Sequence, residues 1–399
     1  MNRREFGAIG LAFGLTPLAA RPIWAADWQT LLEEAKGQTV WFHAWGGDPK
    51  INDFITWLGI LAETRHGVKI TQVKLAATAD AVARVQAEQA AGTRDGAVDL
   101  IWINGENFAA MKEKALLFGP FATELPNWPL VDVTGKPATI TDFTEATMGY
   151  ESPWAMAQLV FEYDSARVPV APLDLSQLKD WILAHPGRFT YPQPPDYLGL
   201  TFLKQVLYGV LPHPAMLQKP VPADVDLSPL WDFLDVIHPA LWRKARAFPA
   251  NEAALGQLLA DAETDISFAF NPGRASAEIA AGNLAETIRT FVLKGGTIGN
   301  ASFVAIPFNA SHKAGAQVVA NLILDPEVQA HAADPTVLGF QTVLDVARLP
   351  AAGRARFAAL PLGAATLPPD RLGPVLLEPH ASWMTRIAKD WTARYGVAP

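Results

Sequence analysis

The stretch that decides the fold is TVWFHAWGGDPK, residues 39–50 of the 399-residue chain. Residues 39–45 are rich in β-branched and aromatic side chains, which favour a strand, and the pair Gly46-Gly47 ends it. The pair Asp48-Pro49 then begins a helix, because aspartate accepts hydrogen bonds from the first helical amides and proline fits the first turn. A strand followed directly by a capped helix is half of a β-α-β unit.

The same alternation continues downstream of this segment. Residues 68–75 form a second predicted strand, a helix follows from about residue 78, and residues 98–103 form a third strand. The sequence Asn-Gly-Glu-Asn at residues 104–107 leads that strand into another helix. Short connections of this kind predict an α/β protein whose parallel sheet binds ligands beyond the carboxyl ends of its strands.

The rest of the chain predicts a second α/β unit. Half of the residues are hydrophobic, and the length is far beyond that of one typical domain, so two lobes with separate cores are expected. We predict further helices and strands over these ranges: helices 176–185, 199–209, 229–236, 252–262 and 315–324, and strands 151–163, 188–191, 265–270 and 302–307. We assign the lobes as follows: lobe 1 at 27–156 with 303–345 returning to it, lobe 2 at 157–302, and C-terminal helices 346–399 packed on lobe 2.

The first 26 residues predict export. Arg3 and Arg4 precede an apolar run over residues 6–20, which is too short and too glycine-rich to anchor the chain in a bilayer. Small residues follow at Ala25 and Ala26, where we expect cleavage. The arginine pair resembles the twin-arginine signal type, and the general secretory route stays open as an alternative. Because cysteine is absent, the mature chain is not expected to be a lipoprotein, and we expect it to be free in the periplasm.

Composition and motifs exclude several classes of function. A formal net charge of −8 argues against nucleic acid and anionic membranes as partners. The chain has no Gly-x-Ser-x-Gly, His-Glu-x-x-His or phosphate-loop motif, and its histidines are dispersed, so we expect no catalytic residue, cofactor or metal site. Paired carboxylates such as Glu145 and Glu151 leave open an exported glycan-acting hydrolase.

Several segments in order resemble the periplasmic solute-binding proteins of ABC importers. They are the hinge-strand sequence at 150–164, the core strand at 264–269, the return strand and helix at 302–307 and 314–324, and Asp-Pro-Glu-Val-Gln at 325–329. Two further stretches, FHAWGGD at 42–48 and GRFTYPQPPD at 187–196, are similar to the YnjB-like subgroup. The resemblance implies a type II Venus-flytrap fold, in which crossing hinge strands join two α/β lobes. It also implies a monomer that passes a small ligand to an inner-membrane permease, and a sensory role remains an alternative.

The candidate ligand-binding residues stand mainly where strands end. They are Trp45, Gly46, Gly47, Asn104, Glu106, Asn107, Trp154, Tyr191, Asp196 and Asn271. Tryptophan offers a flat stacking face, and neighbouring glycines allow a ligand close to the backbone. Core packing of Trp45 or Trp154, and helix capping by Asn104 or Glu106, are the competing interpretations. Carboxylates outnumber cations among the residues near these positions, so we expect a neutral polar or cationic organic ligand with a flat ring.

Overall fold

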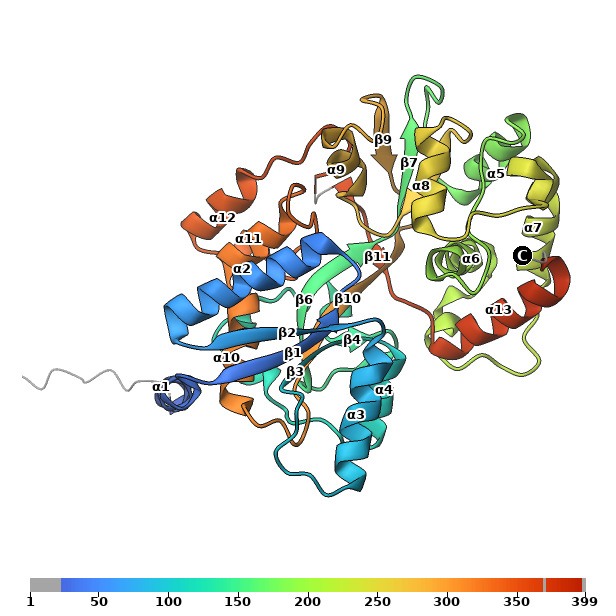
Figure 1. Cartoon of the computed structure of the whole chain (residues 1–399). Coiled ribbons are helices and arrows are strands. Elements are labelled where there is room, and N and C mark those ends of the chain that lie inside the picture. Colours follow the sequence, from blue (N-terminus) through green and yellow to red (C-terminus); the bar gives the residue numbers. More distant parts are fainter. Residues whose placement is uncertain (1–22, 369–370, 397–399) are drawn as a thin grey trace, which may run out of the picture.

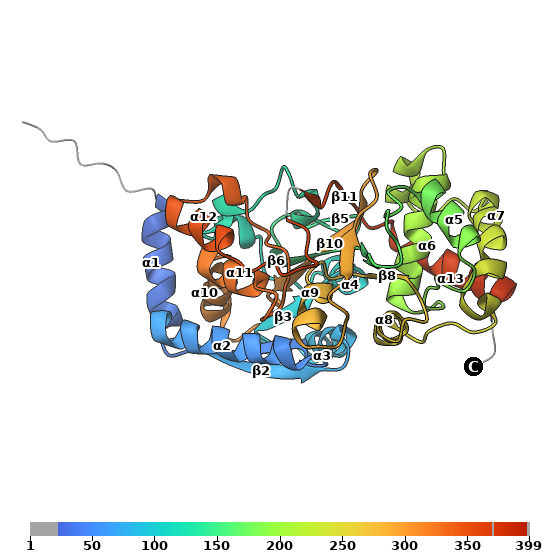
Figure 2. The same ribbon diagram turned by 90° about the horizontal axis from the view of Figure 1, so that it is seen from above.

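The computed structural model describes residues 23–368 and 371–396 and divides them into two lobes (Figures 1 and 2). Each lobe has its own main apolar core. One core is centred on the N-terminal sheet and the other on a buried helix that follows residue 196. The predicted α/β fold of two lobes is therefore confirmed.

Lobe 1 is built on a mixed six-stranded sheet, with neighbouring strands in the order β11-β10-β3-β1-β2 and β6 paired to β10. The strands are β1 (Thr39–Trp45), β2 (Lys69–Leu75), β3 (Leu100–Ile103), β6 (Glu151–Gln158), β10 (Thr297–Ala305) and β11 (Val375–Leu376). β1 is parallel to β2 and β3, as the alternation predicts, whereas β10 is antiparallel to β3 and β6. The carboxyl ends of β1 and β3 therefore reach the same edge of the sheet.

Helices cover both faces of this sheet (Figure 1). They are α1 (Ile23–Ala35), α2 (Pro49–His66), α3 (Thr78–Ala90), α4 (Glu106–Glu113), α10 (Lys313–Ile323), α11 (Pro326–Ala333) and α12 (Ala351–Ala358). A short hairpin, β4 (Thr141–Asp142) with β5 (Glu145–Ala146), lies beside α4. Asp48 caps α2 by accepting a hydrogen bond from the Lys50 amide (2.8 Å), and Gly67 ends the helix in a left-handed conformation.

Lobe 2 contains a small antiparallel sheet and mostly helical structure. Its strands are ordered β8 (Ile266–Ala269), β7 (Val160–Asp164) and β9 (Ile288–Phe291). Its helices are α5 (Leu175–Ala184), α6 (Tyr197–Val210), α7 (Ser228–Ile237), α8 (Glu252–Ala260), α9 (Arg274–Ala280) and α13 (Ala381–Tyr395). Residues 198–207 of α6 are buried on every side, because this helix lies at the centre of the lobe (Figure 1).

Within the described residues, three segments lead from a helix or strand of one lobe to a helix or strand of the other. The first crossing is at Leu159 between β6 and β7, and the second lies between β9 and β10. The third follows β11, where the segment 377–380 leads into α13. At the third crossing the Leu377 carbonyl accepts a hydrogen bond from the Tyr208 hydroxyl of α6 (2.6 Å). These crossings form the hinge.

The structure corrects some predicted boundaries. Residues 188–191 form no strand, because only single backbone bonds tie them to neighbours, such as the Asp265 amide donating to the Arg188 carbonyl (2.9 Å). The return strand begins at Thr297 rather than 302. Within 346–399, α13 packs into the lobe 2 core, but α12 packs on α11, and its Phe357 adjoins the lobe 1 core.

The predicted export signal falls largely outside the described residues. Residues 1–22 are not described, and the backbone of Ala25 and Ala26 lies in the first turn of α1. Across the described ranges, every helix is too short or too polar to cross a membrane.

Candidate ligand-binding site between the lobes

The carboxyl end of β1 is held in one shape by its two glycines. Trp45 ends the strand with 42% of its surface exposed, and its indole ring lies against Gly47. A Cβ at Gly47 would come 2.4 Å from that ring, and a Cβ at Gly46 would come 2.6 Å from the Cβ of Lys74. A side chain at Gly46 would collide with the base of Lys74, whereas one at Gly47 would require the exposed Trp45 ring to shift.

The end of β3 carries polar side chains without partners. Gly105 occupies the N-cap position of α4 with a φ of 59°, so neither Asn104 nor Glu106 caps this helix. Glu106 is exposed and Asn104 and Asn107 are half-buried, and none of the three side chains forms a hydrogen bond or ion pair with the described residues. These groups are available to a ligand, and the capping interpretation is not supported.

Lobe 2 contributes the start of α6. Asp196 caps this helix through the Gly199 amide (3.0 Å). Tyr197, the first helical residue, keeps 36% of its surface exposed, and its ring meets Phe270 edge-on with centroids 5.4 Å apart. The Tyr197 hydroxyl donates to Glu378 Oε1 (2.6 Å) and accepts from Asn300 Nδ2 (2.9 Å). Tyr197 is thus an anchored, partly exposed aromatic residue that the sequence analysis missed. The Lys204 ammonium already lies over its ring, 4.9 Å from the centroid, and also pairs with Glu378.

Two predicted aromatic residues lie in cores instead. Trp154 is 3% exposed and packs between Phe54 of α2 and Trp102 of β3. Tyr191 is fully buried in lobe 2, where its hydroxyl contacts His238 Nε2 (2.7 Å) and accepts from Trp391 Nε1 (2.8 Å). Burial raises the pKa of Tyr191 far above its ordinary value. Both expectations of ligand contact are corrected, because tertiary packing covers these rings.

Asn271 has its polar atoms occupied by the chain. Its Nδ2 donates to the Leu338 carbonyl (3.0 Å), and its Oδ1 accepts from the Gly273 amide (2.9 Å). Asn271 therefore ties the end of β8 to the loop after α11. The structure places it at the junction of the lobes as a connecting residue.

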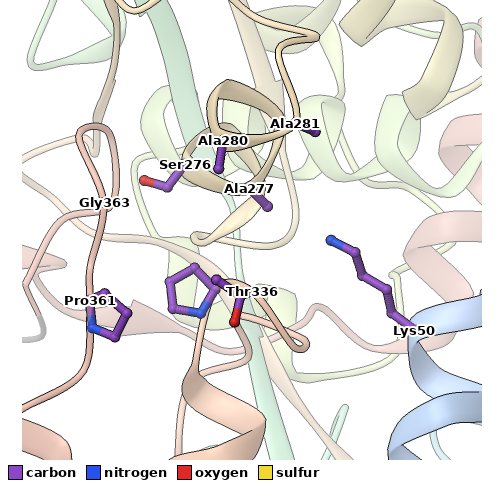
Figure 3. A pocket seen from close by; sticks show the side chains of 9 residues that line it. Lys50, Ser276, Ala277, Ala280, Ala281, Thr336, Pro361 and Gly363 are labelled. Atoms are coloured by element: carbon purple, nitrogen blue, oxygen red, sulfur yellow. The ribbon is translucent and has the colours of Figure 1, made fainter.

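An opening of about 370 Å³ separates the lobes beside α2 and α9 (Figure 3). Lys50 of α2 and Thr336 line it from lobe 1, and Ser276, Ala277 and Ala280 of α9 line it from lobe 2. Figure 3 shows the Lys50 side chain extended toward α9. In Figure 1, α9 lies above α2, whereas α3 and α4 lie below β1, β2 and β3.

Acidic residues stand at the starts of α2, α4, α6 and α8. Asp48, Glu106, Asp196 and Glu252 are at least partly accessible. Nearby cations include Lys50, which is exposed and lines the interlobe opening, and Arg274, which is paired with buried Glu162 and lies 3.9 Å from Glu252.

Two more carboxyl groups lie beneath this surface in lobe 1. Asp142 Oδ2 accepts from the Gly105 amide (2.6 Å), while its Oδ1 and both oxygens of Glu151 are buried without a partner among the described residues. Burial raises the pKa of Asp142 to about 8 and raises that of Glu151 well above its ordinary value. Glu145 is exposed and pairs with Lys112 (3.2 Å), so Glu145 and Glu151 do not flank an accessible substrate site.

Comparison with known proteins agrees with this geometry. A model of bacterial extracellular solute-binding proteins matches residues 61–359. The chain is 43% identical to Protein YnjB of Escherichia coli over 97% of its own length and 98% of that protein. The chain belongs to the bacterial extracellular solute-binding protein family.

Solved structures show the same fold. An extracellular solute-binding protein from Bordetella parapertussis superposes with a TM-score of 0.67 at 12% identity, covering 89% of this chain and 98% of that one. The spermidine/putrescine transporter substrate-binding protein PotD from Streptococcus pneumoniae gives 0.59 at 15% identity, covering 90% and 98%. These likenesses establish the type II periplasmic binding fold, as the resemblance implied.

Membership settles the class of function. This solute-binding protein is the substrate-binding component of an ABC-type importer and not an enzyme, so the hydrolase alternative is set aside. Proteins of this family are periplasmic and deliver small ligands to a permease.

Proposed function

We propose that this protein captures a small cationic or neutral polar organic solute with a flat ring between its lobes. The support is the pairing of accessible aromatic faces with unpartnered acidic and amide groups. Trp45 on lobe 1 and Tyr197 on lobe 2 are each more than one third exposed although both are large aromatic residues. An aromatic face attracts a cation by roughly 0.5–2 kcal/mol, with the larger value where water is excluded.

The carboxylates add selectivity for positive charge. Glu106 has no partner among the described residues, and Asp196 uses only one of its two carboxylate oxygens to cap α6. Asn104 and Asn107 supply both donors and acceptors for polar ring substituents. An anion would meet these carboxylates, and Arg274 is already neutralised by Glu162, which leaves Lys50 at the interlobe opening as an accessible cation.

Capture requires contacts from both lobes. A ligand shifts the population toward a closed form only through interactions that it makes better there. The three crossings restrict the relative motion of the lobes to bending at the hinge. We propose that the closed, loaded protein then docks on the inner-membrane permease as a monomer, without lipid anchor or nucleic acid.

A charge-removing pair of variants tests this proposal. Asp196→Asn keeps a capping side chain at α6 but removes its charge, and Asp174→Asn does the same at α5, where Asp174 accepts from the Gln177 amide (2.8 Å). A thermal-shift screen of the native protein against aromatic amines, thiazolium and pyridinium cations, sugars and organic acids identifies a ligand through its rise in melting temperature.

The expected result is a cationic or neutral ring compound whose affinity falls in Asp196→Asn and stays unchanged in Asp174→Asn. Tight binding of an organic acid, with no response to cations, contradicts the proposed ligand class. Equal losses in the two variants would assign the effect to helix stability instead of ligand charge.

A further inference from the structure

A second cavity adjoins the interlobe opening, because Leu360 and Leu362 line it while Pro361 and Gly363 of the same segment line the opening. It has a volume of about 660 Å³, larger than the opening beside α9, and we call it the hinge cavity. Its walls come from β6 (Met156), the loop after α11 (Phe340, Leu344), α12 (Phe357) and the segment that follows α12 (Leu362). In Figure 2, α12 and β11 lie on one side of β6 and β10, while α2 and α3 lie on the other.

The hinge cavity is the size of a small-molecule site and is lined mainly by apolar side chains. Sites of 300–1,000 Å³ hold ligands of drug size, and their walls are mostly apolar with a few polar groups. None of the predicted interlobe residues lines the hinge cavity. Its lining residues also differ from those of the interlobe opening, so its ligand need not be the transported solute.

Cationic groups predominate among the charged residues of the hinge cavity. Lys136 donates to the carbonyls of Thr342 (2.8 Å) and Leu344 (2.7 Å), both of which line the cavity. Burial lowers the pKa of Lys136 to about 8. Arg354 is exposed, and its Nη1 donates to the Leu349 carbonyl (2.5 Å). The one acid, Asp132, already accepts from the Gly135 amide (2.7 Å).

We propose that the hinge cavity binds an amphipathic carboxylate, with its chain against Met156, Phe340, Leu344 and Phe357 and its head group at Arg354. The apolar walls favour a hydrocarbon body because removing it from water is favourable in proportion to the area buried. The exposed guanidinium favours an anionic head, since it retains donors beyond the one used by Leu349 and pairs with a carboxylate in plane.

Dodecanoate is a suitable probe, compared with dodecanol and dodecylammonium, which have the same chain and a neutral or positive head. Binding to the full-length, delipidated protein is measured by calorimetry below the micellar concentration. We expect one saturable site that prefers dodecanoate.

Leu362→Trp fills the cavity and should weaken dodecanoate binding at least ~10-fold. Arg354→Gln should weaken dodecanoate about 2- to 5-fold and leave dodecanol unchanged.

Trp45→Ala is the matched control, because Trp45 lies at the interlobe site and should leave dodecanoate binding unaltered. Three outcomes overturn the proposal: no saturable binding, binding insensitive to Leu362→Trp, or a preference for dodecylammonium. Loss of dodecanoate binding in Trp45→Ala would place the ligand at the interlobe site, which would also overturn the proposal. None of these results depends on the identity of the transported solute.

Discussion

In lobe 1, Asp142 and Glu151 are buried without an ion pair among the described residues, whereas at lobe 2 Glu162 and Glu378 are buried against Arg274 and Lys204. The residue types are the same, but the physical consequences are opposite. An unpaired buried acid keeps its proton, because burying the charged carboxylate away from water is costly. A paired buried carboxylate is stabilised by its cation. The stability of lobe 1 should therefore depend on pH. The stability of lobe 2 should instead depend on the cation that pairs with each buried acid.

The largest expected effect is at the fully buried pair of Lys204 and Glu378. Lys204→Met leaves Glu378 without its cation and should lower the free energy of unfolding by about 3–5 kcal/mol, measured by urea denaturation. Adding Glu378→Gln removes the stranded charge while keeping an acceptor for Tyr197, so the double variant should recover part of the loss. Equal stability of the single and double variants would argue against an uncompensated charge.

The next effect is a dependence of stability on pH set by Asp142. Its pKa is about 8 in the fold against an ordinary value of 3.8, so between these values the folded state holds a proton that the unfolded chain releases. Stability should therefore fall as pH rises through this interval, by up to about 1.4 kcal/mol per pH unit for one proton, and level off above it.

Asp142→Asn tests this assignment, because asparagine can still accept from the Gly105 amide but does not titrate. Unfolding free energies from pH 5 to 9 should decline less steeply in the variant than in the native protein. Glu151→Gln should act in the same direction, since burial also raises the pKa of Glu151. An unchanged pH profile in both variants would remove these two acids from the explanation.

Replacing Trp45 should have a smaller effect than the changes above, and that effect should be on ligand binding and hardly on stability. Trp45→Ala removes a stacking face and should weaken ligand affinity by ~1–3 kcal/mol, while melting changes slightly because the ring is 42% exposed. Phe42→Ala on the same strand is the control, since Phe42 is 3% exposed and its loss should cost about 3–5 kcal/mol of stability. A destabilised Trp45→Ala with intact binding would assign Trp45 to the core.

The smallest effect is expected at the surface. Arg65 of α2 pairs with Glu327 of α11 (3.0 Å), and both side chains are about one third exposed. Arg65→Met should lower stability by about 0–1 kcal/mol, less at high salt, because exposed pairs are weak and screened. A loss as large as that of Lys204→Met in urea denaturation would show that burial does not distinguish the two pairs.

Local patterns in the sequence predict much of the fold. The segment 39–50 forms β1 and the capped start of α2 as expected, and the strand at 98–103 appears as β3. These elements follow from β-branched runs, glycine breaks and an aspartate cap, which act over a few neighbouring residues. The order of several such segments, together with the family resemblance, predicts the two-lobe architecture.

Side-chain placement was harder to predict because it depends on distant packing. Tyr191 and Tyr197 are six residues apart, yet Tyr191 is enclosed by Trp391 of α13 while the ring of Tyr197 remains accessible. The position of Tyr197 directly after the Asp196 cap could have indicated it. Nothing in the α12 sequence tells which lobe it joins, because an apolar helix face fits either core.

The third crossing has a consequence for how the molecule can be divided. Lobe 2 consists of residues from about 159 to 296 together with α13 near the C-terminus. Lobe 1 consists of the segment before residue 159 and most of the segment between residue 296 and α13. A single protease cut near Leu159 would leave two covalent links between the halves. No uninterrupted fragment contains the whole of either half alone, so a single cut does not yield an isolated lobe.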